Sequence, residues 1–183
     1  MQVEQTPIPD VRLVTPSRHG DHRGFFSETF RLSALHAADI KVDWVQDNHS
    51  FSKSRGVVRG LHFQRPPFAQ AKLLRVVRGA ILDVAVDLRR ASPTYGRHVA
   101  VELSAENWRQ LYVPVGFAHG FCTLTENCEV LYKTSAEYSP AEEGGVLWND
   151  PDLKIVWPIE TSVATLSARD SEWPCLKDLA SPF

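Results

Sequence analysis

The chain has 183 residues, of which 43% are hydrophobic and 23% are charged, and its formal net charge is −2. This composition is that of a soluble globular protein, and the length suits one domain with a single core rather than two. The charge gives no bulk attraction to nucleic acid or an acidic membrane, and no apolar run approaches the roughly 20 residues of a membrane-spanning helix.

The N-terminal region is expected to carry no export signal and to contain one aromatic strand. Met1 is followed by no basic region and no apolar stretch, so a signal peptide is not expected. The three cysteines form no CxxC pair, which is typical of a reducing cytoplasm. In residues 21–30, a turn at Gly24 followed by alternating Phe26, Glu28 and Phe30 predicts a strand with aromatic and charged groups on one face. Residues 32–38 are then expected to form two helical turns.

From about residue 56 to residue 135 the pattern is mostly that of β-strands. Apolar side chains at 82, 84, 86 and 88 share one face, with Asp83 and Asp87 on the other, and residues 98–103 alternate in the same way. Glycine, proline and asparagine turns separate these strands, which predicts a β-sandwich or a barrel-like jelly roll. A short helix is expected over 104–110, capped by Ser104, and another after Ser167.

Two glycine-framed histidines interrupt the apolar strands, His62 in RGLHFQ (59–64) and His119 in PVGFAHGF (114–121). A single histidine in a strand is more often a hydrogen-bonded structural residue than a functional one. Two of them, with a tyrosine, a lysine and several arginines at strand-like positions nearby, indicate a site inside the fold, because imidazole exchanges protons near neutral pH.

A metal site is the first alternative, since metal-binding cupins use a His-x-His pair, a following Glu and a third histidine from a later strand. The segment around His119 matches the later element. The segment around His62 does not, because Phe63 and Gln64 follow it and the next histidine is His98. Two imidazoles without a third and without a placed carboxylate make a poor cage for a transition metal, so no metal is expected.

Without a metal, His62 is a candidate general base, and either Asp170 or Asp83 could orient its far nitrogen. Tyr132 is a candidate proton donor if its strand runs close to the His119 strand; the alternative is a half-buried strand tyrosine with a solvated hydroxyl. Lys72 and Arg59 fit recognition of an anion or stabilisation of an oxyanion, although a single exposed cation is most often only solvated.

Strict strand alternation argues against one part of this site. It places Arg59 and His62 on opposite faces of the same strand. They can share a pocket only if Gly60 hosts a bulge or a kink, which glycine permits.

Taken together, the motifs closely resemble the dTDP-4-dehydrorhamnose 3,5-epimerase family, whose members are metal-free, cupin-like enzymes of dTDP-L-rhamnose synthesis. They cover most of residues 10–170 in order and at near-constant spacing. The matching stretches are DHRGFFSETF (21–30), VQDNHSFSKSRGVVRGLHFQ (45–64), AKLLRVVRGAILDVAVDLRRASPTYG (71–96), LSAENWRQLYVPVGFAHGF (103–121), YKTSAEYSP (132–140) and WNDPDLKIVWP (148–158).

The resemblance implies a mainly β, cupin-type jelly-roll sandwich forming one epimerase domain over 1–183, with an irregular, short-helical segment from about 160 to 183. It implies that His62 is the general base, that Asp170 pairs with it and that Tyr132 is the general acid, with Lys72 and His119 holding the sugar and its enolate. No cofactor or metal is implied. The implied substrate contacts are Arg23, Phe26, Glu28, Gln46, Asp47, Asn48, Arg59, Lys72, His119, Tyr138, Glu143 and Arg169.

The family also implies a cytoplasmic homodimer in which the strand at about 20–30 joins the partner subunit, so that Phe26 serves the neighbouring site. Two positions depart from the common pattern, Arg169 for a frequent lysine and Glu137 for a frequent aromatic residue. Three alternatives stay open: a dTDP-ketosugar epimerase that inverts only C3 or only C5, a metal-dependent cupin enzyme, and a non-catalytic sugar-nucleotide binding module.

Overall fold

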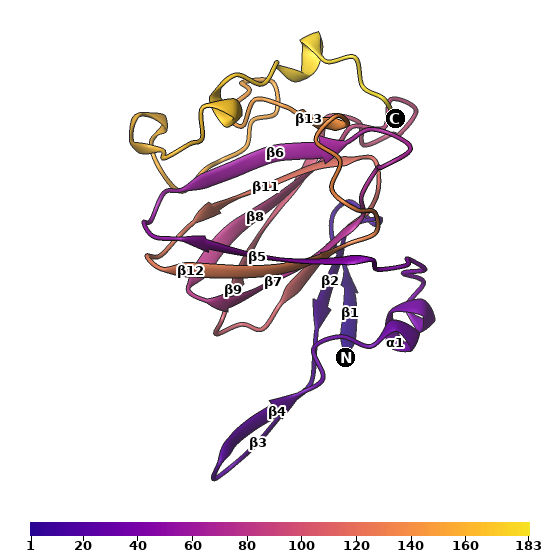
Figure 1. Cartoon of the computed structure of the whole chain (residues 1–183), viewed down its shortest axis with the longest axis vertical. Helices are drawn as coiled ribbons and strands as arrows, with labels where there is room; N and C mark the ends of the chain where they lie inside the picture. The colour runs from indigo at the N-terminus through magenta and orange to yellow at the C-terminus, as the bar shows by residue number, and fades with distance from the viewer.

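A computed structural model describes all 183 residues and shows two antiparallel β-sheets packed face to face (Figure 1). The predicted mainly β jelly-roll sandwich is therefore confirmed. One sheet has six strands, in the spatial order β1 (Gln2–Gln5), β2 (Arg12–Thr15), β10 (Gln110–Val113), β7 (Lys72–Arg78), β12 (Cys128–Thr134) and β5 (Gln46–Ser52). The other has five, in the order β13 (Glu143–Gly145), β6 (Val58–Gln64), β11 (Phe117–Thr123), β8 (Ala80–Asp87) and β9 (His98–Ser104).

The main core lies between the two sheets. Strict alternation turns every second apolar residue of β7, β10 and β12 toward the other sheet, where those residues meet side chains of β8, β9 and β11. Representative members are Leu74, Val76, Leu111, Val130, Ile81, Ala85, Leu103 and Phe121. Because hydrophobic burial fills only part of the space between the sheets, the remainder is free for a polar site.

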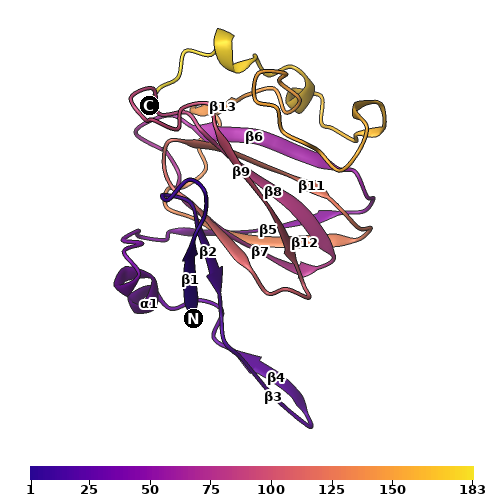
Figure 2. The same ribbon diagram turned by 180° about the vertical axis from the view of Figure 1, so that it is seen from behind.

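The C-terminal segment covers the outer face of the five-stranded sheet. Leu153, Leu176 and Leu179 pack there against Leu61 and Val84, and Figures 1 and 2 show this segment running over β6. It contains three short 3-10 helices, η1 (Thr161–Val163), η2 (Arg169–Ser171) and η3 (Leu176–Asp178). As a result, β8 is buried on both faces. Val84 and Val86 lie under the C-terminal segment. Asp83 and Asp87, which point to the opposite face, are buried as well.

The short helices are only partly as expected. The helix α1 (Leu32–Ala37) confirms the two predicted turns, and no helix is both long and apolar enough to cross a membrane. The helix predicted over 104–110 is wrong. The hydroxyl of Ser104 accepts the N–H of Asn107 at 3.0 Å, and Oδ1 of Asn107 accepts the N–H of Ser104 at 3.1 Å. The same Oδ1 also accepts the N–H of Arg109 at 3.0 Å, and Trp108 has a φ of 60°. These contacts close a turn, because an asparagine side chain competes with helical backbone hydrogen bonds.

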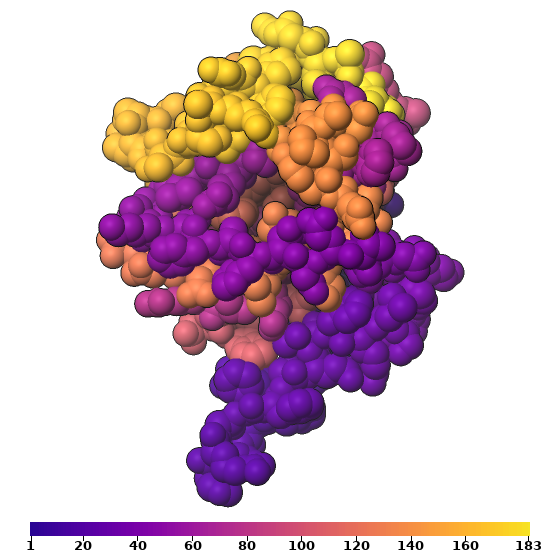
Figure 3. All heavy atoms as spheres, in the orientation of Figure 1, coloured from indigo at the N-terminus to yellow at the C-terminus, as the bar shows by residue number.

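An N-terminal hairpin stands clear of the sandwich (Figure 3). It pairs β3 (Arg18–Asp21) with β4 (Gly24–Ser27), confirming the turn before Gly24. The strand ends at Ser27, so the alternation expected to continue to Phe30 is wrong. Phe25 and Phe26 are 57% and 72% exposed. An isolated two-stranded hairpin is marginal in water. Within its own chain this hairpin packs Phe25 edge-on against Trp108, with 4.8 Å between the ring centroids, which leaves Phe26 on the open side.

A buried polar network ties the end of β8 to its surroundings. Asp87, with no exposed surface, accepts hydrogen bonds from the guanidinium of Arg89 and the hydroxyls of Ser92 and Thr94. Burial raises the pKa of Asp87, but these hydrogen bonds outweigh it and lower the pKa to about 2. The folded chain therefore stabilises the carboxylate form of Asp87 more strongly than the unfolded chain does.

We predict that Asp87→Asn destabilises the fold by about 2 kcal/mol near neutral pH, because the folded-state pKa lies below the ordinary value. The stabilisation is present above pH 3.8 and is lost as the pH falls toward 2. Urea unfolding at fixed protein concentration, at pH 7 and at pH 3, measures it. The difference in the free energy of unfolding between wild type and variant should be smaller at pH 3 than at pH 7. An equal difference at both pH values would contradict the role given to Asp87.

Candidate active site

A cavity of about 660 Å³ lies between the sheets, beside the main core. Its wall is unusually rich in ionisable groups, which a sandwich interior excludes unless they are paired or used. Both sheets and the C-terminal segment contribute to it. The ionisable side chains on its wall are Arg59, His62, Lys72, His119, Tyr132, Glu143, Arg169 and Asp170.

A bulge in β6 brings Arg59 and His62 to one side of the sheet. His62 pairs with His119 and Arg59 with Phe121, so two residues of β6 lie opposite a single residue of β11. Gly60 occupies the bulge with a φ of 123°. The bulge at Gly60 that Arg59 and His62 need in order to share a pocket is therefore present. Both side chains line the cavity.

The imidazole of His62 is held by a carboxylate from the C-terminal segment. Its Nε2 lies 2.5 Å from Oδ1 of Asp170, and the other carboxylate oxygen accepts the backbone N–H of Gly60. Burial opposes ionisation of Asp170, but the hydrogen bond and charge of His62, with hydrogen bonds from Gly60 and Ser167, together outweigh it and lower the pKa of Asp170. Of the two carboxylates considered from the sequence, the structure pairs Asp170 with His62. The other ring nitrogen, Nδ1, is left without a protein partner.

Tyr132 reaches the cavity from the opposite sheet. Its strand is not a hydrogen-bonded neighbour of the His119 strand; it faces that strand across the sandwich. Burial raises the pKa of Tyr132, which the nearby cation of Arg59 partly offsets. The phenol therefore keeps its proton, and it meets the cavity from the side opposite His62.

Lys72 and His119 form a second group of titratable side chains. Burial lowers the pKa of Lys72 to about 8, against the opposing charges of Asp83 and Glu143. His119 is buried, and its Nε2 lies 2.8 Å from Oδ1 of Asp83. Burial lowers the pKa of this imidazole, partly countered by Asp83. Asp83 is thus the partner of His119 and not of His62.

An adjoining hollow of about 380 Å³ shares His62, Lys72, Tyr132 and Glu143 with the cavity. Gln46, Asn48 and Tyr138, three further expected contacts, line it together with Gln64. At the mouth of this hollow, Glu143 accepts a hydrogen bond from the phenol of Tyr138 at 3.0 Å. The same carboxylate forms an ion pair with Arg169.

Gln64 was not predicted as a site residue, although it lines the adjoining hollow. Its Nε2 donates to the carbonyls of Phe68 and Glu137, and its Oε1 accepts the N–H of Ser139. This buried amide fixes the loop that carries Tyr138. A polar residue at the end of an apolar strand was the only available signal.

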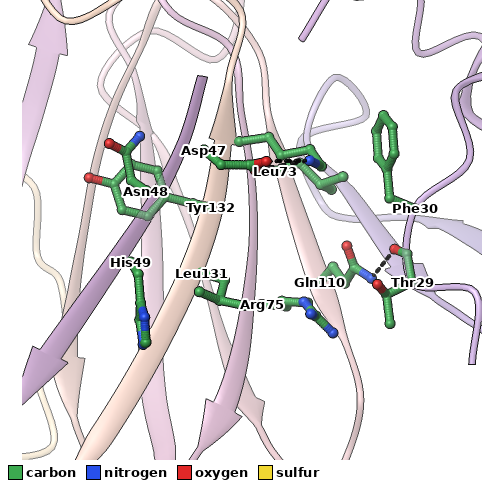
Figure 4. Close-up of a pocket in the computed structure, with 11 residues that line it drawn as sticks. Thr29, Phe30, Asp47, Asn48, His49, Leu73, Arg75, Gln110, Leu131 and Tyr132 are labelled. Carbon is green, nitrogen blue, oxygen red and sulfur yellow. Dashed lines mark hydrogen bonds and ion pairs between the residues drawn. The ribbon is translucent and has the colours of Figure 1, made fainter. Parts of the chain in front are cut away.

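Asp47 lies on the other face of the six-stranded sheet. It pairs with Lys133 at 2.9 Å beside an outer hollow of about 400 Å³ (Figure 4). The residues Arg75, Leu131 and His49 line that hollow, which alternation along β5, β7 and β12 turns away from the core. Asp47 is therefore not brought together with His62.

Arg23, Phe26 and Glu28 are also absent from the cavity of their own chain. Arg23 pairs with Asp21 on the projecting hairpin, and Glu28 pairs with Arg31 at 3.3 Å. The remaining expected residues lie on the wall of the cavity or of the adjoining hollow.

The arrangement suits proton transfer on two sides of one bound molecule. An imidazole with a carboxylate partner can act as a base, a protonated phenol opposite can act as an acid, and an ammonium on the same cavity wall can stabilise negative charge. The structure holds no cluster of three or more His, Cys, Asp or Glu side chains suited to a metal ion.

Comparison with known proteins gives a consistent result. Residues 5–178 match the family described as dTDP-4-dehydrorhamnose 3,5-epimerase. An enzyme of that name from Shigella flexneri is 51% identical over 171 residues, covering 93% of each chain.

Solved structures agree. The enzyme of the same name from Bacillus anthracis, with TDP and PPi bound, superimposes with a TM-score of 0.92 at 46% identity, covering 95% of this chain and 98% of that one. A dTDP-6-deoxy-D-glucose-3,5-epimerase from Legionella pneumophila, in complex with dTDP-4-keto-L-rhamnose, gives 0.93 at 40% identity, covering 97% and 94%.

We predict that Gly60→Ala destabilises the protein by more than about 2 kcal/mol and removes its activity. An added Cβ would lie 2.6 Å from the Cα of Gly120 and 2.8 Å from the carbonyl oxygen of His119, at a φ that side chains rarely adopt. Urea unfolding measures the loss. Stability equal to that of wild type would show that the bulge tolerates a side chain.

Proposed function

The chain belongs to the dTDP-4-dehydrorhamnose 3,5-epimerase family, and we propose that it converts dTDP-4-dehydro-6-deoxy-D-glucose to dTDP-4-dehydro-L-rhamnose by inverting C3 and C5. The observation that carries this proposal is the placement of His62 with Asp170 on one wall of the cavity and Tyr132 on the opposite wall. A simple binding module has no use for an opposed acid and base.

The chemistry follows from the C4 carbonyl of the substrate. The carbonyl acidifies the hydrogens on C3 and C5, so one base beside the ring serves both carbons in turn. His62 removes a proton, the electron pair moves onto the C4 oxygen, and an enolate forms. The ammonium of Lys72, with His119 beside it, stabilises that charge. Tyr132 then protonates the carbon from the other face, which inverts it.

Each expected group is suited to its role. The lowered pKa of Asp170 favours the carboxylate that orients His62 and stabilises its protonated form, while the raised pKa of Tyr132 keeps a proton available for delivery. These steps need neither a redox cofactor nor a metal, because the carbonyl itself makes the hydrogens acidic.

The remaining expected residues would hold the nucleotide and the sugar. Arg59 supplies a positive charge at the cavity for the diphosphate, and Arg169 with Glu143 forms a polar rim across its mouth. Gln46, Asn48 and Tyr138 would contact the substrate in the adjoining hollow. We assign Asp47 only an indirect role, through its pairing with Lys133 on the outer face.

The projecting hairpin supports a homodimer with composite sites. Phe26 is 72% exposed, Phe25 keeps more than half of its surface exposed although its ring packs edge-on against Trp108, and β5 is an open edge of the six-stranded sheet next to the cavity. We propose that the hairpin of one protomer docks at this edge of the other, so that Phe26 stacks on the nucleotide and Arg23 and Glu28 contact its polar groups.

We also propose a cytoplasmic location, because the three cysteines without a CxxC pair are typical of a reducing compartment.

Turnover in D₂O tests the reaction. Wild type should introduce deuterium at both C3 and C5, as read by proton NMR, and His62→Ala should abolish both exchanges, at least about 10²-fold, with dTDP binding nearly unchanged by calorimetry. The matched variant Tyr132→Phe should lose net inversion more than proton abstraction. Deuterium at one carbon only would indicate a single-centre epimerase, and exchange surviving in His62→Ala would mean another base.

Subunit complementation tests the composite site. His62→Ala and the double variant Arg23→Ala/Phe26→Ala should each be inactive as homodimers. A heterodimer of the two, purified through two affinity tags, contains one intact site and should recover about half of the wild-type activity. A wild-type heterodimer carrying the same tags is the control. An inactive heterodimer, or an active Arg23→Ala/Phe26→Ala homodimer, would refute the exchange of the hairpin.

A further inference from the structure

Two aspartates on β8 are wholly buried, and their surroundings differ. Asp87 is surrounded by donors, including the guanidinium of Arg89. Asp83 receives one hydrogen bond, from His119, and its Oδ2 has no protein partner. A buried carboxylate with so few donors is costly to keep, since its charge is desolvated without compensation. Such a group is retained where its charge is used.

The position of Asp83 beside His119 points to how its charge is used. Cross-strand pairing places Asp83 opposite Phe121 and Ala85 opposite His119 on adjacent strands, so the carboxylate lies diagonally behind the imidazole. By accepting the Nε2 proton of His119, it fixes the ring and leaves Nδ1 as the nitrogen without a protein partner. The ring and Lys72 then line the same cavity.

We propose that Asp83 is a positioning residue for the epimerisation: its buried carboxylate orients His119 and supplies the negative charge that keeps the ammonium of Lys72 protonated beside the substrate. The proposal rests on the function assigned above. Asp83 does not touch the reacting carbons; it acts through Lys72 and His119, which hold the C4 oxygen.

The electrostatics of Lys72 support this role. The charged and titratable groups that face it come from every surrounding element: Arg59 and His62 on β6, Asp83 on β8, His119 on β11, Tyr132 on β12, Glu143 on β13 and Asp170 on η2. Only Asp83 and Glu143 raise its pKa appreciably, against the effect of burial. Glu143 is already paired with the Arg169 cation, whereas Asp83 has no cationic side chain bonded to it.

The test is the pH dependence of kcat in Asp83→Asn, which keeps an acceptor for His119 but removes the charge. In wild type, loss of the Lys72 proton should make kcat fall near pH 8, which gives the pH profile of kcat an alkaline limb. In Asp83→Asn this limb should move to lower pH by about one unit, and kcat at pH 7.5 should fall about 10²-fold with a much smaller change in KM. Tyr132, whose pKa is raised, cannot produce this limb.

Asp87→Asn is the matched control, because it neutralises a buried aspartate of the same strand that is bonded to Arg89 and does not contribute to the pKa shift of Lys72. It should lower stability and leave the alkaline limb in place. Asp83→Glu, which retains the charge, should lose kcat but keep the limb at its wild-type pH. ¹⁵N NMR of labelled lysines provides a readout without turnover: the Lys72 midpoint should be lower in Asp83→Asn than in wild type.

Asp83→Asn with an unmoved limb and an unmoved Lys72 midpoint would overturn the proposal, even if its activity fell. If Asp83→Asn does not fold, Asp83→Glu decides the question, and a limb displaced in that charged variant would also overturn it. Absence of epimerisation in wild type is a separate result, which would refute the proposed function itself.

Discussion

The contact between His62 and Asp170 is the interaction on which the site depends. The two residues are 108 positions apart in the chain, and their side chains meet at 2.5 Å because the C-terminal segment crosses the outer face of the five-stranded sheet. The hydrogen bond needs the bulge at Gly60, which turns His62 inward and offers its own N–H to the same carboxylate. The apolar packing of Leu153, Leu176 and Leu179 holds the segment in place. The position of Asp170 beside His62 therefore depends on the same apolar contacts that pack the C-terminal segment onto the sheet.

The cavity combines charged groups that an ordinary sandwich would exclude. In the proposed mechanism, His62 on β6 with Asp170 on η2 is the base and Tyr132 on β12 is the acid. Lys72 on β7 and His119 on β11 stabilise the developing negative charge. Because the two sheets are rigid and hydrogen-bonded across their length, these groups are held apart at a fixed separation. Preorganisation of this kind lets fixed charges act on an enolate without rearrangement.

The sequence predicted the strands well, since alternation along β8 and β9 is a local property. It also identified the bulge as a requirement, from the single glycine between Arg59 and His62. Residue patterns alone could not choose between Asp83 and Asp170 as the partner of His62, because that choice depends on the register of β11 against β8 and on the path of the C-terminal segment. Only the family resemblance implied Asp170. The failed helix after Ser104 has a local cause, since Asn107 closes a turn that the pattern of apolar residues does not reveal.

The position of Asp170 near the end of the chain has a consequence for synthesis on the ribosome. All thirteen strands, and with them His62, Lys72 and Tyr132, precede residue 146, so the sandwich can assemble before the last segment has emerged. Only when η2 leaves the exit tunnel does the imidazole acquire its carboxylate. A polypeptide that stops before residue 170 would lack the carboxylate that orients His62, and under the proposed function it would be inactive.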